Sequence, residues 1–201
     1  MKEKKFLSVK NMAIIAILSS LSAVLMLFEF PLPFIAPPFY GIDFSEIPAL
    51  IGGFALGPLA GVVIECLKIV IKLLLKPTST AFVGEIGNIL IGLCLILPAT
   101  MIYRKLKSRN GALLGLVVGT VCMAIGGALT NLYFLLPAFS TLMNIPIDDF
   151  VAMGTAIFPI VTSPFTFVLF CTAPFNLIKG SLVSVIVALI YKQMSILIKK
   201  I

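Results

Sequence analysis

The sequence predicts an all-α integral membrane protein in which residues 1–201 form a single transmembrane domain of six helices. Hydrophobic residues make up 60% of the chain and charged residues only 11%, whereas soluble domains average about 25% charged residues. The mean hydropathy is +1.18. Because a transmembrane helix needs about 20 apolar residues, the chain has room for five or six helices but not for a separate soluble domain.

The net charge of +7 is concentrated in three basic clusters. They are Lys2, Lys4, Lys5 and Lys10; Arg104, Lys105, Lys107 and Arg109; and Lys192, Lys199 and Lys200. The positive-inside rule places all three clusters in the cytoplasm. Membrane topology therefore explains the positive charge without nucleic acid as a partner, and it predicts a multi-pass protein of the prokaryotic plasma membrane with both termini cytoplasmic.

An even number of spans must then separate the first basic cluster from the second. A total of six spans satisfies this condition, because the first four then lie between the two clusters. The six are at about 11–29, 46–56, 59–75, 85–103, 111–136 and 162–192. The first is interpreted as a span rather than a signal peptide, because no small-x-small cleavage site follows it. Gly57-Pro58 divides the second from the third, because proline lacks an amide hydrogen and disfavours helix before it. The second span would rise only ~16 Å, so neighbouring helices must bury it.

The outer connections carry most of the prolines. The first, about 30–45 between helices one and two, contains Pro31, Pro33, Pro37 and Pro38 among aromatic residues. It can be a rigid lid over a membrane site or an interfacial aromatic belt. The third, about 137–161, is expected to contain a short helix from Ile147 to Phe158, with Asp148 and Asp149 stabilising its N-terminus.

Lys179 predicts a binding site inside the membrane. It is the only charged residue between Phe150 and Tyr191, and a lysine at this depth costs roughly 2.5–3.5 kcal/mol on insertion scales. Asn176 lies three residues earlier on the same helix face, and Asn131 falls in the outer half of the fifth helix. Three polar side chains at one depth are typical of a site for a small polar ligand.

Other intramembrane polar residues leave alternatives open. Glu85 and Asn88 lie on one face at the start of the fourth helix, where Glu85 either stabilises the helix N-terminus or binds ligand. Glu65 and Lys68 share a face of the third helix and can pair. Lys72 and Lys76, further along that face, either extend to the membrane interface or attract an anionic substrate.

Several chemistries are excluded by the residues that the sequence lacks. There is no histidine, hence no Ser-His or Cys-His catalysis and no histidine metal site. The four cysteines form no CxxC pair, and no GxxxxGK[ST] loop binds ATP. No catalytic or metal residue is predicted. Active transport would draw on a partner or an ion gradient. One competing hypothesis is therefore a stand-alone ion-coupled carrier of a small polar solute that uses Glu65, Lys68 and Glu85. The other is a membrane enzyme that modifies lipid.

Four segments carry a resemblance to a known family: residues 41–48 (GIDFSEIP), 84–88 (GEIGN), 152–154 (AMG) and 173–180 (APFNLIKG). The chain resembles the S component, the substrate-binding membrane subunit, of energy-coupling factor (ECF) transporters, and specifically the riboflavin-specific RibU type. The resemblance implies high-affinity riboflavin binding, with riboflavin as substrate and no cofactor. It also implies a membrane T component and two cytoplasmic ATP-binding-cassette ATPases as partners. An S component for another vitamin is the nearest alternative.

The resemblance also implies which residues meet the ligand and the partner. Asn131, Asn176 and Lys179 correspond to the residues that contact the vitamin, and the first outer loop is expected to close over it. The further binding candidates are Phe39, Tyr40, Gly41, Asp43, Phe44, Thr80, Phe82, Glu85 and Asn88. For the Ala-x-x-x-Ala pattern that docks the T component, two matches on the first helix stay open, namely Ala16 with Ser20 and Ser19 with Ala23.

Overall fold

The computed structural model describes the backbone of residues 8–200 and the side chains of residues 8–191. Lys2, Lys4 and Lys5, together with the side chains of Lys192, Lys199 and Lys200, lie outside the described part, and so do the predictions made from them. In chain order the elements are α1 (Val9–Leu27), β1 (Phe30–Pro31), β2 (Gly41–Ile42), α2 (Glu46–Leu56), α3 (Pro58–Leu75), α4 (Val83–Leu106), α5 (Arg109–Thr130), a π-turn (Asn131–Leu135), α6 (Leu136–Met143), α7 (Ile147–Ile157), α8 (Pro164–Phe167), a second π-turn (Val168–Thr172) and α9 (Ala173–Lys200).

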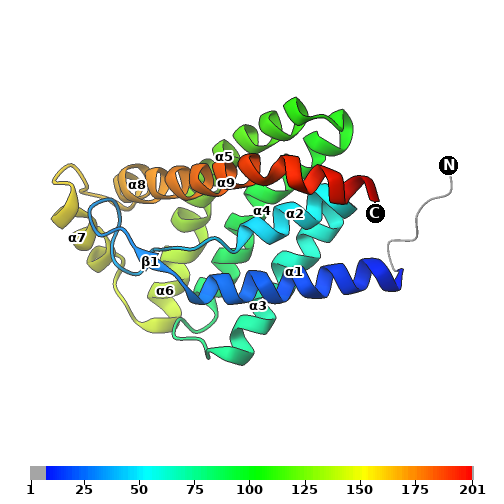
Figure 1. Cartoon of the computed structure of the whole chain (residues 1–201). Coiled ribbons are helices and arrows are strands. Elements are labelled where there is room, and N and C mark those ends of the chain that lie inside the picture. The colour runs from blue at the N-terminus through cyan, green and yellow to red at the C-terminus, as the bar shows by residue number, and fades with distance from the viewer. Residues whose placement is uncertain (1–7, 201) are drawn as a thin grey trace.

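The helices pack side by side in one bundle, in which the start of α1 and the end of α9 lie at the same end (Figure 1). The β1–β2 hairpin, α6 and α7 gather at the opposite end. Within the described residues, four segments are long and apolar enough to cross a membrane: 9–27, 83–106, 109–143 and 164–191. The mostly helical, membrane-type fold that the sequence predicts is therefore present, whereas six spans and cytoplasmic termini stay predictions.

The division between α2 and α3 lies at Gly57, as the sequence indicates. Gly57 has φ +106°, a left-handed conformation that side-chain-bearing residues rarely adopt. Pro58 then occupies the first position of α3, where its missing amide hydrogen costs nothing. α2 is only 11 residues long, and α3 carries three charged side chains, Glu65, Lys68 and Lys72. Glu46 of α2 and these three side chains of α3 all take part in ion pairs inside the bundle.

The fifth helix runs further than the sequence predicts. It does not give way to a loop at residue 137 but continues through the Asn131–Leu135 π-turn into α6, which ends at Met143. The π-turn already interrupts the regular hydrogen-bond pattern, so Pro137 falls in the first turn of α6, where proline is tolerated. The short helix predicted from Ile147 is confirmed as α7, with Asp148 and Asp149 in its first turn.

The 28–45 loop, which connects α1 to α2, folds back on itself and packs inward. Its short strands pair antiparallel, with Phe30 opposite Ile42 and Pro31 opposite Gly41. Ala36 and Ile42 are completely buried in an apolar cluster with side chains of α7, α8 and α9. This inward packing is expected of a lid rather than of an aromatic belt alone, although Phe34 at the loop tip remains exposed.

Substituting Ile42 tests how firmly the loop is held. Ile42→Ala removes a fully buried side chain and leaves a cavity, so we expect a loss of about 2–5 kcal/mol in the free energy of unfolding. Unfolding of the detergent-solubilised protein, followed by circular dichroism in increasing denaturant, measures this loss. Phe34→Ala, at a side chain that is 67% exposed, is the matched control and should change the stability little.

Candidate small-molecule binding site

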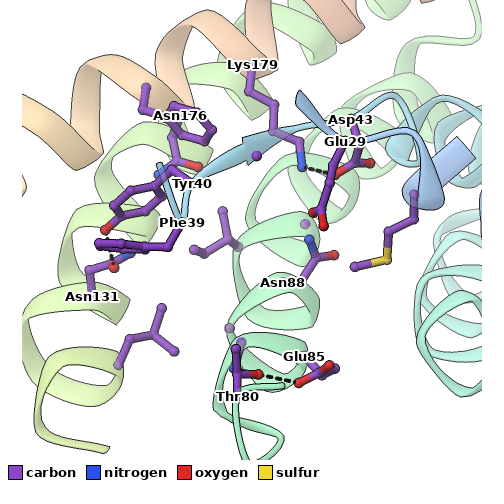
Figure 2. A pocket seen from close by; sticks show the side chains of 18 of the residues that line it. Glu29, Phe39, Tyr40, Asp43, Thr80, Glu85, Asn88, Asn131, Asn176 and Lys179 are labelled. Atoms are coloured by element: carbon purple, nitrogen blue, oxygen red, sulfur yellow. Dashed lines mark hydrogen bonds and ion pairs between the residues drawn. The ribbon is translucent and has the colours of Figure 1, made fainter. Parts of the chain in front are cut away.

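The 28–45 loop covers a cavity of about 490 Å³. The cavity is lined by this loop, by the end of α3 and the connection to α4, by one face of α4, by the region of the first π-turn, and by α9. Figure 2 shows its polar side chains arriving from these separate segments and pointing toward one another. Small-molecule sites typically enclose about 300–1,000 Å³, so the cavity has the size of a ligand pocket.

Tyr40 fastens the loop to the helices at one end of the cavity. Its hydroxyl donates to Asn131 Oδ1 at 2.6 Å and lies 2.9 Å from Thr172 Oγ1. A phenol has only one proton, so the Thr172 hydroxyl must donate to Tyr40. Burial raises the pKa of the Tyr40 phenol, which keeps it a neutral donor. Asn131 in turn donates to the carbonyl of Gly127 at 2.9 Å, and its amide is thereby fixed.

Both π-turns adjoin the polar groups of the cavity. Asn131 begins the first, and Thr172 ends the second. Asn176, one turn further along α9, donates from Nδ2 to the Thr172 carbonyl at 3.0 Å. A π-turn shifts the side chains that follow it around the helix axis and is frequent at functional sites. These two turns therefore explain how asparagines from separate segments come to face one cavity.

Asn88 supplies a buried polar group that has no partner within the described part of the chain. It lines the cavity from α4, and Figure 2 shows its side chain pointing into the space between the loop and the helices. Among the described side chains, its Oδ1 is buried without a hydrogen-bond partner. An unpaired buried carbonyl costs about 1–3 kcal/mol. A ligand that donates a hydrogen bond to Asn88 would recover this cost.

Lys179 binds two carboxylates. Its Nζ lies 2.9 Å from Asp43 Oδ2 and 3.0 Å from Glu46 Oε1, so the ammonium holds the end of the loop against α9 (Figure 2). Burial opposes ionisation of Asp43, but the charges of Lys179 and Lys68 and the hydrogen bonds from Ser45 and Lys179 together outweigh it and lower the pKa of the Asp43 carboxyl below its usual value. Lys179 also lines the cavity, so its predicted contact with a ligand stays a prediction beside these two ion pairs.

A second buried lysine extends this interaction. Lys68 Nζ lies 2.6 Å from Glu65 and 3.7 Å from Glu46, and it donates to Ser45 Oγ at 2.9 Å. The predicted pairing of Glu65 with Lys68 is thus confirmed. We call Asp43, Glu46, Glu65, Lys68 and Lys179 the buried ion cluster; each of these residues is at most 4% exposed.

Glu85 lies at the far side of the cavity and is paired rather than free. It accepts from Lys72 at 2.8 Å, from Thr78 at 3.0 Å and from Thr80 at 2.7 Å. Lys76, in turn, lies 3.8 Å from Glu29. Both lysines that the sequence left as possible attractors of an anion therefore face a carboxylate.

The structure brings most of the predicted residues together. The predicted residues that line the cavity are Phe39, Tyr40, Gly41, Asp43, Thr80, Glu85, Asn88, Asn131, Asn176 and Lys179. Phe44 and Phe82 lie outside this lining: Phe44 packs near Phe30 with ring centroids 6.3 Å apart, and Phe82 is 55% exposed. Glu46 and Phe175 line the cavity but were not predicted. The three-residue spacing between Asp43 and Glu46 was the available signal, since it supplies two charges close together for a buried lysine.

The two candidate docking pairs on α1 face opposite ways. Ser19 and Ala23 are completely buried within the chain, so they offer no surface to another protein in this conformation. Ala16 and Ser20 are exposed, and Ser20 bonds back to the Ala16 carbonyl at 2.9 Å. Of the two pairs, Ala16 and Ser20 are therefore the one that a partner helix can reach.

A covered, polar-lined cavity in a bundle of apolar helices is typical of membrane proteins that bind small molecules. The chain belongs to the family of substrate-specific components of ECF transporters, whose sequence profile matches residues 10–191. The family consists of transporter components, not enzymes. Membership confirms the sequence-based resemblance.

Individual relatives agree with this assignment over nearly their whole length. The chain is 33% identical to the riboflavin transporter FmnP of Bacillus subtilis strain 168, over 92% of each protein. It is 29% identical to the riboflavin transporter RibU of Staphylococcus aureus strain TCH60, over 96% of this chain and 94% of that one. A solved structure of the S component of a bacterial ECF transporter matches with a TM-score of 0.72 at 29% identity, covering 94% of this chain and 98% of the other.

Removing the Lys179 charge should destabilise the fold. Lys179→Met leaves Asp43 and Glu46 without their closest cation, and breaking a buried ion pair from one side typically costs about 3–5 kcal/mol. We expect a clear drop in the thermal midpoint of the detergent-solubilised protein, measured by nanoscale fluorimetry or circular dichroism. Lys76→Met, at a side chain that is 60% exposed and 3.8 Å from its partner, should shift it little, and equal shifts would contradict the assignment.

Proposed function

We propose that this chain is the high-affinity riboflavin-binding subunit of an ECF-type vitamin uptake transporter. The observation that carries the proposal is the covered cavity of about 490 Å³, which is lined by aromatic side chains of the loop and by Asn88, whose Oδ1 has no hydrogen-bond partner among the described side chains. Riboflavin has a flat ring with apolar faces, and its edge carries hydrogen-bond donors and acceptors. The names of the relatives, riboflavin transporters from two bacteria, favour the same vitamin.

The aromatic groups suit the ring. Tyr40 lies 4.6 Å from Phe39 and 5.2 Å from Phe175, measured between ring centroids, and all three line the cavity. Flat aromatic ligands stack against such side chains at similar separations. We propose that Asn88, Asn131 and Asn176 bond the polar edge of the flavin, with Tyr40 holding Asn131 in place.

The charges of the cavity favour a neutral ligand. Among the described residues, the lining carries the cations Lys72, Lys76 and Lys179, and each has a carboxylate within 4.0 Å. An anionic ligand would have to compete with those carboxylates, whereas uncharged riboflavin would not. This charge pairing also weakens the hypothesis of an ion-coupled carrier, because Glu65 and Glu85 already hold lysine partners.

Energy for transport is proposed to come from partners, namely a membrane T component and two cytoplasmic ATP-binding-cassette ATPases. The sequence contains no ATP-binding loop of its own. The exposed Ala16–Ser20 face of α1 is the proposed docking surface, because small residues let membrane helices approach closely. The 28–45 loop would then act as the lid that opens toward the outside.

Titration of riboflavin into the purified protein, followed by quenching of flavin fluorescence, tests the vitamin assignment. We expect saturable tight binding to the wild type. Asn88→Ala and Asn176→Ala each remove one hydrogen bond and should weaken binding about tenfold. Asn110→Ala, at an exposed asparagine near the α4–α5 turn, should bind like the wild type. An absence of saturable binding would eliminate riboflavin as the substrate.

A bulky residue on the exposed face of α1 should separate binding from transport. In Ala16→Leu, the larger side chain keeps a partner helix at a distance, so riboflavin uptake by cells that carry the transporter should fall at least about tenfold. Fluorescence titration should still give wild-type affinity, because Ala16 lies away from the cavity lining. Ile17→Leu, at a neighbouring exposed residue, is the control; uptake lost in both variants would argue against this docking face.

A further inference from the structure

The buried ion cluster contains unequal numbers of acids and bases. Three carboxyls, those of Asp43, Glu46 and Glu65, face only two ammoniums, those of Lys68 and Lys179. Full ionisation would therefore leave one negative charge uncompensated among residues that are at most 4% exposed. An unpaired charge in such surroundings is strongly disfavoured, and one bound proton removes it.

The unpartnered oxygens identify the carboxyls that can hold this proton. Both oxygens of Asp43 are occupied, Oδ2 by Lys179 and Oδ1 by the Ser45 amide at 2.8 Å. Among the described side chains, Glu46 Oε2 and Glu65 Oε2 are buried without a hydrogen-bond partner. The other oxygen of each glutamate lies within 4.0 Å of Lys68 Nζ, so the two glutamates flank one ammonium.

We propose that the Glu46–Glu65 pair binds one proton at neutral pH, and that it does so only while Asp43 is docked on Lys179. The ionisable groups acting on Glu65 are Lys68 on its own helix, Glu46 on α2 and Lys179 on α9. Asp43 of the loop affects Glu65 indirectly, through its charge interactions with the two lysines. α4 contributes main chain at Gly92, where an added Cβ would collide with Glu65 Oε1. Near the same cluster, α1 contributes the Ser22 hydroxyl, which bonds to the Ser45 carbonyl.

Charge balance then links the proton to the position of the loop. With Asp43 docked, two carboxylates and one neutral carboxyl balance two ammoniums. With Asp43 withdrawn, Glu46 and Glu65 must both be ionised to balance the same two ammoniums. Opening of the loop therefore breaks one carboxyl O–H bond, leaves the electron pair on the glutamate, and delivers the proton to water. Because the closed state holds more protons, lower pH favours closure.

Infrared spectroscopy of the purified chain without ligand tests the proton directly. A neutral carboxyl gives a C=O stretch separate from those of carboxylates and amides. At pH 7 we expect this band in the wild type and its loss in Glu65→Gln and, decisively, in Asp43→Asn, which removes a charge at a distance from the proton. Glu29→Gln, at an acid that is 48% exposed, should keep the band. A wild type without the band, or an Asp43→Asn variant that retains it, would overturn the proposal.

Kinetics supply a second readout, which rests on the proposed riboflavin binding. If release requires the loop to open, the dissociation rate of riboflavin should rise with pH in the wild type, by at most about tenfold per pH unit for one proton. In Glu65→Gln, which has no proton to lose, the rate should not depend on pH. Identical pH profiles would contradict the link to the loop. Failure of riboflavin to bind would leave the infrared result to decide the proton site.

Discussion

The buried ammonium of Lys179 is the constraint on which the rest of the structure depends. A lysine in an apolar interior needs counter-charges, and it obtains them from Asp43 at the end of the 28–45 loop and from Glu46 at the start of α2. This single requirement fixes the end of the loop, the first turn of α2 and the N-terminal part of α9 at one point. The cavity exists because the loop is held there, above α4 and the first π-turn, while Tyr40 holds its other side.

The elements that form the site are irregular where their polar groups are placed. α2, too short to span a membrane by itself, supplies Glu46 to the buried ion cluster, and α3 supplies Glu65 and Lys68 to it and Lys72 to Glu85. The two π-turns lie beside Asn131 and Asn176. Membrane helices tolerate such departures only where neighbouring segments satisfy the backbone and the charges, so the irregular positions coincide with the binding cavity.

Sequence reasoning identified the polar residues but not all of their partners. Lys179, Asn176 and Asn131 could be recognised because polar side chains are rare and costly in apolar helices. The two carboxylates of Lys179 were not assigned to it, because the pairing joins residues more than 130 positions apart. The end of the fifth helix was misjudged at Pro137, since a π-turn leaves no clear signature in the sequence. Phe82 was placed near a ligand because it is aromatic, but its position in the α3–α4 connection turns it outward.

The two attachments of the loop differ in kind, and the difference bears on release. The Tyr40–Asn131 hydrogen bond joins neutral groups and is worth roughly 0.5–1.5 kcal/mol. Breaking a buried ion pair such as Asp43–Lys179 costs about 3–5 kcal/mol when a charge is left without its partner. A closed loop of this kind retains a ligand until something compensates the exposed charges. Water entering from outside, or a rearrangement of the helices imposed by a partner, can do so. The same ion pair that builds the cavity therefore also opposes emptying it.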